Sequence, residues 1–113
     1  MSNIWIGDGR LTKDPELRQS RSGKAVASMR IAVDRPGDDD GADFFDLMAF
    51  GTLAEVTAKY LTKGRHILVE GTLRQQTWTD DETGQRRGRT EIIANRVTFL
   101  DGPKAQVEPD AAA

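Results

Sequence analysis

Hydrophobic and polar residues alternate along several stretches of the chain. This pattern predicts β-strands, because residues two apart in an extended chain share a face. The clearest example is the stretch 25–35, where one face is apolar and carries Ala27, Met29, Ile31 and Val33. The other face carries Ser28, Arg30 and Asp34. We therefore expect a strand that is buried on one side only.

The stretch 43–50 is also a predicted strand, and it has aromatic residues on both faces. One face is apolar and is expected in the core: Phe45, Leu47 and Ala49. The other face combines aromatic and polar groups: Phe44, Asp46, Met48 and Phe50. We expect the Phe44 ring to be exposed on this second face. For Phe50, burial in a small second core beneath a loop is nearly as good an interpretation as exposure on this face.

Residues 65–79 and 86–100 predict a long hairpin that turns at 80–84, an Asp-, Thr- and Gly-containing segment. The apolar face of its first strand carries Ile67, Val69, Gly71 and Leu73. The opposite face carries Thr72, Arg74, Gln76 and Trp78. Gly71 predicts a bend or bulge. We expect Trp78 on the open face, the alternative being that it packs against a neighbouring strand or protomer.

Residues 52–61 form the only predicted helix. Thr52 and Glu55 have the spacing of a capping box, and Lys63 and Gly64 mark the end. The apolar stripe that would face the core consists of Leu53, Val56, Tyr60 and Leu61.

The stretch 3–11 predicts a further strand, interrupted by Gly7 and Gly9, with Ile4 and Ile6 on one face and Trp5 on the other. For Trp5, packing between protomers is the preferred interpretation and a place on a ligand path the alternative. Residues 36–41 predict a turn or mobile loop. Its acidic run lacks the residue spacing of a calcium-binding loop.

The order of the predicted elements is three strands, one helix and two strands. This is the layout of the oligonucleotide/oligosaccharide-binding (OB) fold, an all-β, five-stranded Greek-key barrel, here with its helix between strands 3 and 4. An α+β sandwich with the same element order stays open. Residues 1–100 are expected to form this one domain, and residues 101–113, which show no periodicity, a short disordered tail.

The composition excludes several classes of site. The 113 residues include no cysteine and one histidine, His66, so disulfides and thiolate metal sites are excluded and no metal or other cofactor is expected. The first ten residues lack a basic leader followed by an apolar run. We therefore expect a cytosolic protein without a membrane partner.

Charge is unevenly distributed, although the formal net charge is only −2. Residues 1–35 carry seven Lys and Arg against four Asp and Glu, and residues 59–96 carry eight against five. The acidic excess lies in residues 36–58 and 97–113. A ligand that carries phosphates needs a local positive surface, which this pattern permits. Arg86, Arg87 and Arg89 form the strongest basic cluster, although solvated surface charge explains any single cation about as well.

Several separated segments resemble bacterial-type single-stranded DNA-binding proteins. They are GRLTKDPELR (9–18), SGKAVASMRIAV (22–33), FFDLMAFGTLAE (44–55), YLTKGRHILVEGTLRQQTW (60–78) and TEIIANRVTFL (90–100). The resemblance implies an OB barrel that coats single-stranded DNA without sequence preference during replication, recombination and repair. It also implies a homo-oligomer, with a tetramer favoured and a dimer as the alternative, in the cytoplasm and associated with the nucleoid. It implies no enzymatic activity.

The resemblance also indicates which residues bind DNA. The family's stacking aromatics fall on Phe44, Phe50 and Trp78, and its basic positions on Arg30, Lys63 and Arg74. We add Arg86 and Arg87 from the basic cluster beside the hairpin turn.

The chain departs from the family pattern at two places. An aromatic that many members carry after the second strand has no counterpart at residues 34–37. Many members also end in an acidic tip with a terminal phenylalanine that recruits other proteins. This chain ends in Ala111, Ala112 and Ala113, so recruitment through such a tip is not expected.

Two other functions stay open at this point. An accessory subunit of a primosome or recombination complex would use the same barrel mainly for protein contacts. A small barrel nuclease would need acids and bases clustered around a metal or phosphate, whereas the acids here gather mainly in one loop.

Overall fold

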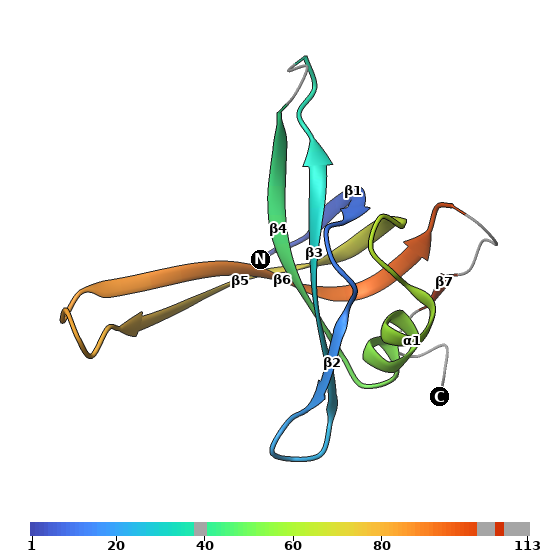
Figure 1. Ribbon diagram of the computed structural model, residues 1–113. Coiled ribbons are helices and arrows are strands. Elements are labelled where there is room, and N and C mark those ends of the chain that lie inside the picture. The colour runs from blue at the N-terminus through green and yellow to red at the C-terminus, as the bar shows by residue number, and fades with distance from the viewer. Residues whose placement is uncertain (38–40, 102–105, 108–113) are drawn as a thin grey trace.

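The computed structural model describes residues 1–37, 41–101 and 106–107. Its elements are β1 (Trp5–Leu11), β2 (Glu16–Gln19), β3 (Ala25–Asp34), β4 (Ala42–Phe50), α1 (Thr52–Tyr60), β5 (His66–Thr79), β6 (Arg86–Phe99) and β7 (Gln106–Val107). Figure 1 shows α1 beside a strongly curved sheet from which hairpins project. Among the described residues, no helix has the length and apolar character needed to cross a membrane.

Five of the strands close into a barrel. The sheet runs β1–β5–β6–β4–β3, and a second pairing joins β1 to β3 and completes the ring. Most pairs are antiparallel, whereas β4 and β6 pair in parallel at Leu47 and Ile92. With α1 following β4 in the chain, this is the predicted OB fold.

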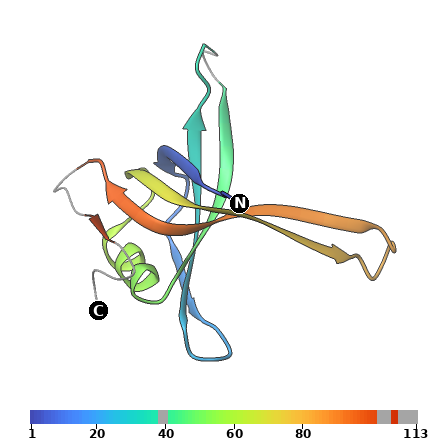
Figure 2. The same cartoon turned by 180° about the vertical axis from the view of Figure 1, so that it is seen from behind.

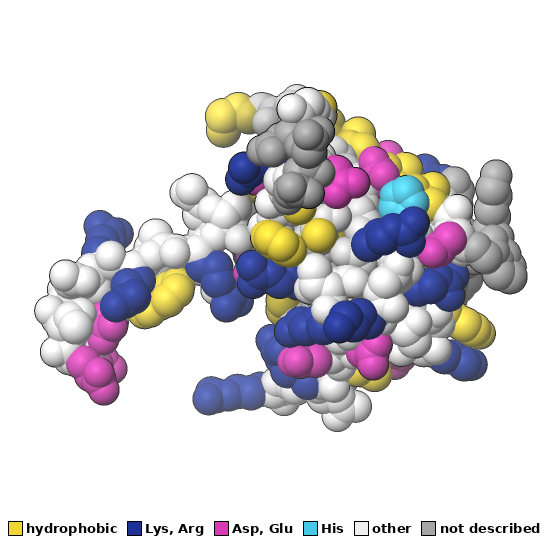
Figure 3. All heavy atoms as spheres, turned by 45° about the horizontal axis from the view of Figure 1, so that its top comes forward, with side chains coloured by type: hydrophobic (Ala, Val, Ile, Leu, Met, Phe, Trp, Pro, Cys, Tyr) yellow, Lys and Arg dark blue, Asp and Glu magenta, His cyan; other side chains and the backbone are white. Residues whose placement is uncertain are grey.

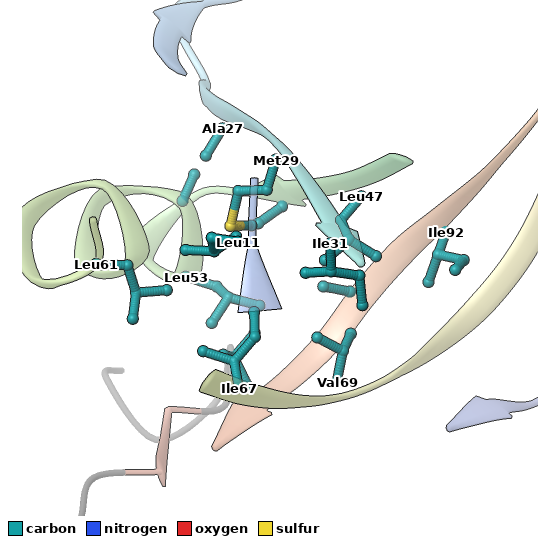
Figure 4. Close-up of a cluster of buried hydrophobic side chains, with 14 of the residues drawn as sticks. Leu11, Ala27, Met29, Ile31, Leu47, Leu53, Leu61, Ile67, Val69 and Ile92 are labelled. Carbon is teal, nitrogen blue, oxygen red and sulfur yellow. The ribbon is translucent and has the colours of Figure 1, made fainter. Parts of the chain in front are cut away.

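The barrel interior contains the predicted apolar faces. Figure 4 shows side chains from β1, β3, β4, β5, β6 and the helix region meeting in one cluster. The fully buried members include Ile31, Leu47, Ile67 and Val69. Helix α1 packs against β3, β4 and β2, with Leu53 and Ala54 buried. The strand periodicity therefore identified the core correctly, although Tyr60 of the predicted helix stripe is exposed.

The predicted capping box is wrong. The N-cap of α1 is Gly51, at φ 65°, and no side chain caps the helix. A positive φ suits glycine, and it lets the chain turn from β4 directly into the helix. Thr52 is therefore already the first helical residue rather than the cap, and Glu55 donates its backbone N–H to the Gly51 carbonyl.

The predicted interruption of the first strand is also wrong, because β1 runs without a break through Gly7 and Gly9. A Cβ at Gly9 would lie 2.3 Å from the carbonyl oxygen of Ala32. Glycine therefore permits the close approach of β1 to β3 that closes the barrel.

Two strands lie where none was predicted. The first is β2, which pairs with β3 and shifts the helix from after the third strand to after the fourth. All four residues of β2 are exposed. A strand without a buried face needs no alternation of apolar and polar residues, so the sequence pattern did not predict it. The second is β7, inside the segment expected to be disordered, where two residues pair with Val97 and Thr98 of β6. Of the acidic loop, residues 38–40 lie outside the described residues.

The far halves of β5 and β6 leave the barrel as a two-stranded projection, residues 73–90, which we call the arm (Figures 1 and 2). The register shifts between Glu70 and Gly71, so the irregularity predicted at Gly71 is confirmed, but the extra residue is Asn95 of the partner strand β6. Leu73 follows this irregularity and is 38% exposed, because among the described residues the arm is a two-stranded ribbon outside the barrel.

Candidate functional site

The outer face of β4 presents an exposed aromatic ring beside a cation. The Phe44 side chain is 54% exposed. The guanidinium carbon of Arg30, on the neighbouring strand β3, lies 5.2 Å from the centre of the Phe44 ring. Arg30 also pairs with Asp46, with Nη1 and Oδ1 3.9 Å apart. The strand register explains this grouping. Arg30 is directly opposite Asp46, and Phe44 is two residues from Asp46 on the same strand, so the three side chains lie on one face of the sheet.

Phe50 is on the same face at the other end of β4, and it is half-buried. Its ring also has a cation beside it, since the Lys24 ammonium lies 5.6 Å from the ring centre. Ring and cation thus recur at both ends of β4, although the Phe50 ring offers less free surface than the Phe44 ring.

On the arm, Trp78 is 46% exposed. It is directly opposite Arg87, and Gln76 is opposite Arg89, so these four side chains share one face of the ribbon. We call this the front face of the arm. Arg87 also pairs with Asp80 in the turn, with Nε and Oδ2 2.9 Å apart.

Arg86 lies on the reverse face of the arm, opposite Thr79. Neighbouring residues of a strand point to opposite sides, so Arg86 is not grouped with Trp78 and Arg87. The reverse face otherwise carries uncharged residues: Gln75, Thr77, Thr79, Gly88 and Thr90. The basic cluster of the sequence is therefore divided between two surfaces.

Glu91 is the principal residue of this surface that the sequence analysis missed. It is only 2% exposed. Its carboxylate accepts hydrogen bonds from Arg74 at 3.1 Å, Gln76 at 2.9 Å and Arg89 at 3.2 Å. Glu91 thereby joins both strands of the arm where the arm meets the barrel. The predicted turn could have identified Glu91, because it places residues 74 and 91 opposite each other across the hairpin.

A hollow of about 300 Å³ connects the arm with the barrel surface. Its lining includes Glu16 and Arg18 of β2, Asp46 and Met48 of β4, and Glu91 of β6. Arg18 donates a hydrogen bond to the Ser28 hydroxyl at 3.0 Å, inside the same hollow. The outer face of β4 and the base of the arm therefore belong to one continuous surface, which we call the groove.

The remaining predicted positions lie elsewhere. Lys63 follows α1, where its backbone N–H donates to Asp14 Oδ1 at 2.7 Å, and it does not line the hollow. The Trp5 ring packs on Phe45 at a centroid distance of 5.3 Å, at the margin of the core. His66 pairs with Asp8, with Nε2 and Oδ2 2.6 Å apart.

Acidic groups lie among the cations of this surface. In Figure 3, dark blue Lys and Arg side chains follow the arm and the adjoining barrel, with magenta acids between them. At the arm's turn, the backbone N–H of Glu82 and the Arg87 side chain bind the Asp80 carboxylate and lower its pKa. Among the described residues, no three Asp, Glu or His side chains are grouped as a metal site would need.

This arrangement suits a ligand that is both flat and anionic. Exposed rings offer stacking surfaces, and nearby guanidinium and ammonium groups attract phosphates. The Phe44 and Trp78 rings are open to solvent, so the surface fits an extended chain better than a small molecule enclosed in a pocket.

The chain matches the model of the single-strand binding protein family over residues 1–100. It is 45% identical over 104 residues to the single-stranded DNA-binding protein of Thermotoga maritima, covering 87% of this chain and 73% of that protein. The Clostridium perfringens protein of the same name is 44% identical over 94 residues, which is 82% of this chain and 62% of that protein. The Treponema pallidum protein of that name is 40% identical over 97 residues, covering 81% and 54%. The chain therefore belongs to the single-strand binding protein family.

Proposed function

We propose that this protein binds and coats single-stranded DNA without sequence preference. The observation that carries the proposal is a pair of exposed rings, each beside a cation: Phe44 beside Arg30, and Trp78 beside Arg87 on the arm. The hollow joins the outer face of β4, which carries Phe44, to the base of the arm that carries Trp78. Membership in the family and the printed names of the relatives support the same ligand.

Two interactions would bind the DNA. Unpaired bases stack on Phe44 and Trp78, with Phe50 as a third ring, because every base has a flat face and stacking does not depend on sequence. Phosphates bind Arg30, Arg74 and Arg87 and displace the counterions condensed on the DNA. Duplex DNA has its bases already stacked on one another, so single strands are preferred.

The proposed site is narrower than the sequence alone suggests. Arg86 faces the reverse of the arm and Lys63 lies outside the hollow. Both are expected to attract DNA at longer range rather than to contact the stacked bases. Arg18 and Arg89, which line the hollow, are added as phosphate ligands.

This activity is binding, not catalysis. Coating protects single strands from nucleases and from refolding during replication, recombination and repair, and we propose these settings for the protein. The same ligand favours a place in the cytoplasm at the nucleoid.

We also propose a homo-oligomer, with a tetramer favoured over a dimer. Ile4 and Ile6 are 73% and 60% exposed at β1. Within the described residues, residues 5–9 of β1 pair only with β5, which leaves one backbone edge of that part of the strand open. An apolar, half-open edge strand is a favourable surface for pairing with a second copy.

Titration with an oligo-dT tests the proposed ligand. Because Trp78 is exposed, its fluorescence should be strongly quenched when a base stacks on it, and added salt should reverse the quenching. A duplex of equal length should compete poorly. Absence of quenching, together with unchanged anisotropy of a labelled oligo-dT, would contradict DNA coating and favour a role in protein contacts.

A further inference from the structure

The groove contains an exposed carboxylate that is close to one of its stacking rings. Asp46 is two residues from Phe44 on the outer face of β4 and also lines the hollow. An acid at this position repels the phosphates of the proposed ligand. Its location therefore requires a physical explanation.

Asp46, Arg30 and Phe44 form one contact group. The Arg30 guanidinium carbon lies 5.2 Å from the ring centre of Phe44, and its Nη1 lies 3.9 Å from Asp46 Oδ1. The side chains of Arg30 and Asp46 are both about half exposed, at 48% and 44%. In the free protein, the cation thus lies over one face of the ring and within ion-pair distance of the carboxylate.

We propose that Asp46 competes within the protein against DNA for Arg30 and, through Arg30, for the Phe44 ring. This inference rests on the proposed function and concerns how tightly the groove binds. When a base stacks on Phe44 and its phosphate approaches, Arg30 moves from the ring and the carboxylate to the phosphate. The lost pair with Asp46 subtracts from the affinity and keeps binding readily reversible.

Other acids of this region differ from Asp46 in a way that supports the assignment. Glu16, which also lines the hollow, pairs with Lys13 of the β1–β2 connection at 3.3 Å. Glu91 is buried and joins three side chains of the arm, so it positions cations and is not displaced. Asp43 pairs with Arg35 at 2.9 Å and is also half-exposed, but it is an odd number of residues from Asp46 and points to the other side of β4.

The test compares Asp46→Asn with the matched control Asp43→Asn. Each change removes one negative charge and one exposed ion pair on the same strand. Exposed pairs contribute about 0.2–1 kcal/mol, so Asp46→Asn should bind labelled oligo-dT about 1.4- to fivefold more tightly at low salt. The gain should shrink at high salt, because screening weakens the competing pair. Asp43→Asn should bind as the parent protein does.

Arg30→Gln separates competition from simple repulsion. If Asp46 acts through Arg30, adding Asp46→Asn to Arg30→Gln should give little of the gain seen in the parent protein. A full gain in this background would overturn the proposal, as would an equal gain from Asp43→Asn or no gain from Asp46→Asn. Thermal unfolding of each variant verifies that it is folded. If the parent protein itself does not bind oligo-dT, the proposed function fails; if it binds and only the predicted gain is missing, the inference alone fails.

Discussion

The face on which a side chain lies decides what it contributes to the groove. Arg86 and Arg87 are adjacent in the sequence, yet only Arg87 lies across from Trp78. Phe44 and Phe45 differ in the same way, since Phe44 is exposed and Phe45 packs against the core. At this scale a substitution and its neighbour form a natural pair of test and control.

Trp78→Ala should weaken binding of oligo-dT by about 1–3 kcal/mol, because it removes one stacking surface. Stability should hardly change, since the ring is half-exposed on the arm. Anisotropy of a labelled oligonucleotide measures the affinity. Thr77→Ala, on the reverse face, is the control and should bind normally. Equal losses in both variants would show that the arm as a whole, not the ring, is responsible.

Among the elements, the arm depends on a close approach between β5 and β6. A Cβ at Gly71 would lie 2.3 Å from the backbone oxygen of Ile93, which cannot move aside as a flexible side chain can. Gly71→Ala should therefore lower the free energy of unfolding by about 1–3 kcal/mol. Gly88→Ala is the matched control on the same hairpin, because its nearest atom would be 3.7 Å away. Urea unfolding compares the two, and similar midpoints would contradict the argument.

The junction between β5 and the end of β6 depends on Asp101. Its carboxylate binds the Arg65 side chain at 2.9 Å and the backbone N–H of His66 at 3.2 Å, and both contacts lower the pKa of Asp101 below its usual 3.8. A lowered pKa in the folded state means that this stabilisation is complete above 3.8 and is lost as the pH falls through the folded value.

Asp101→Asn removes this titration. The variant should be less stable than the parent protein at neutral pH, and the difference should narrow as the pH falls below 3.8. Thermal melting at a series of pH values measures it. A difference that stays constant down to the lowest pH would show that the charge of Asp101 is not responsible.

At the scale of the whole molecule, the apolar edge at β1 should determine assembly. Ile6→Glu places a charge on a side chain that is already 60% exposed, so the barrel should fold. The charge would be desolvated in an oligomer interface, so the oligomer of the variant should dissociate at a higher protein concentration than that of the parent protein. Light scattering measures the mass. Leu17→Glu, also exposed at 51% but on β2, is the control. A parent protein that is already monomeric would contradict the proposed oligomer.

Periodicity and turn residues in the sequence determined most of the fold. Apolar residues at every second position identified the inward faces of β3, β4 and β5, because burial in one core requires that spacing. The irregular pairing at Gly71 and the long hairpin could also be predicted from local signals. With element order, these features were sufficient for the OB fold and for Phe44 and Trp78 as exposed rings.

The way in which distant strands meet depends on the tertiary structure. The unbroken β1 depends on its pairing with β5, and the short β2 depends on its pairing with β3. The cap at Gly51 is fixed by its backbone hydrogen bond to Ala25 of β3. Local propensity contains none of these contacts. The same holds for Asp46 beside Arg30 and for the hollow that joins β2, β4 and β6. Local sequence sets the face of each side chain, whereas barrel closure sets its neighbours, and the chemistry of the groove depends on both.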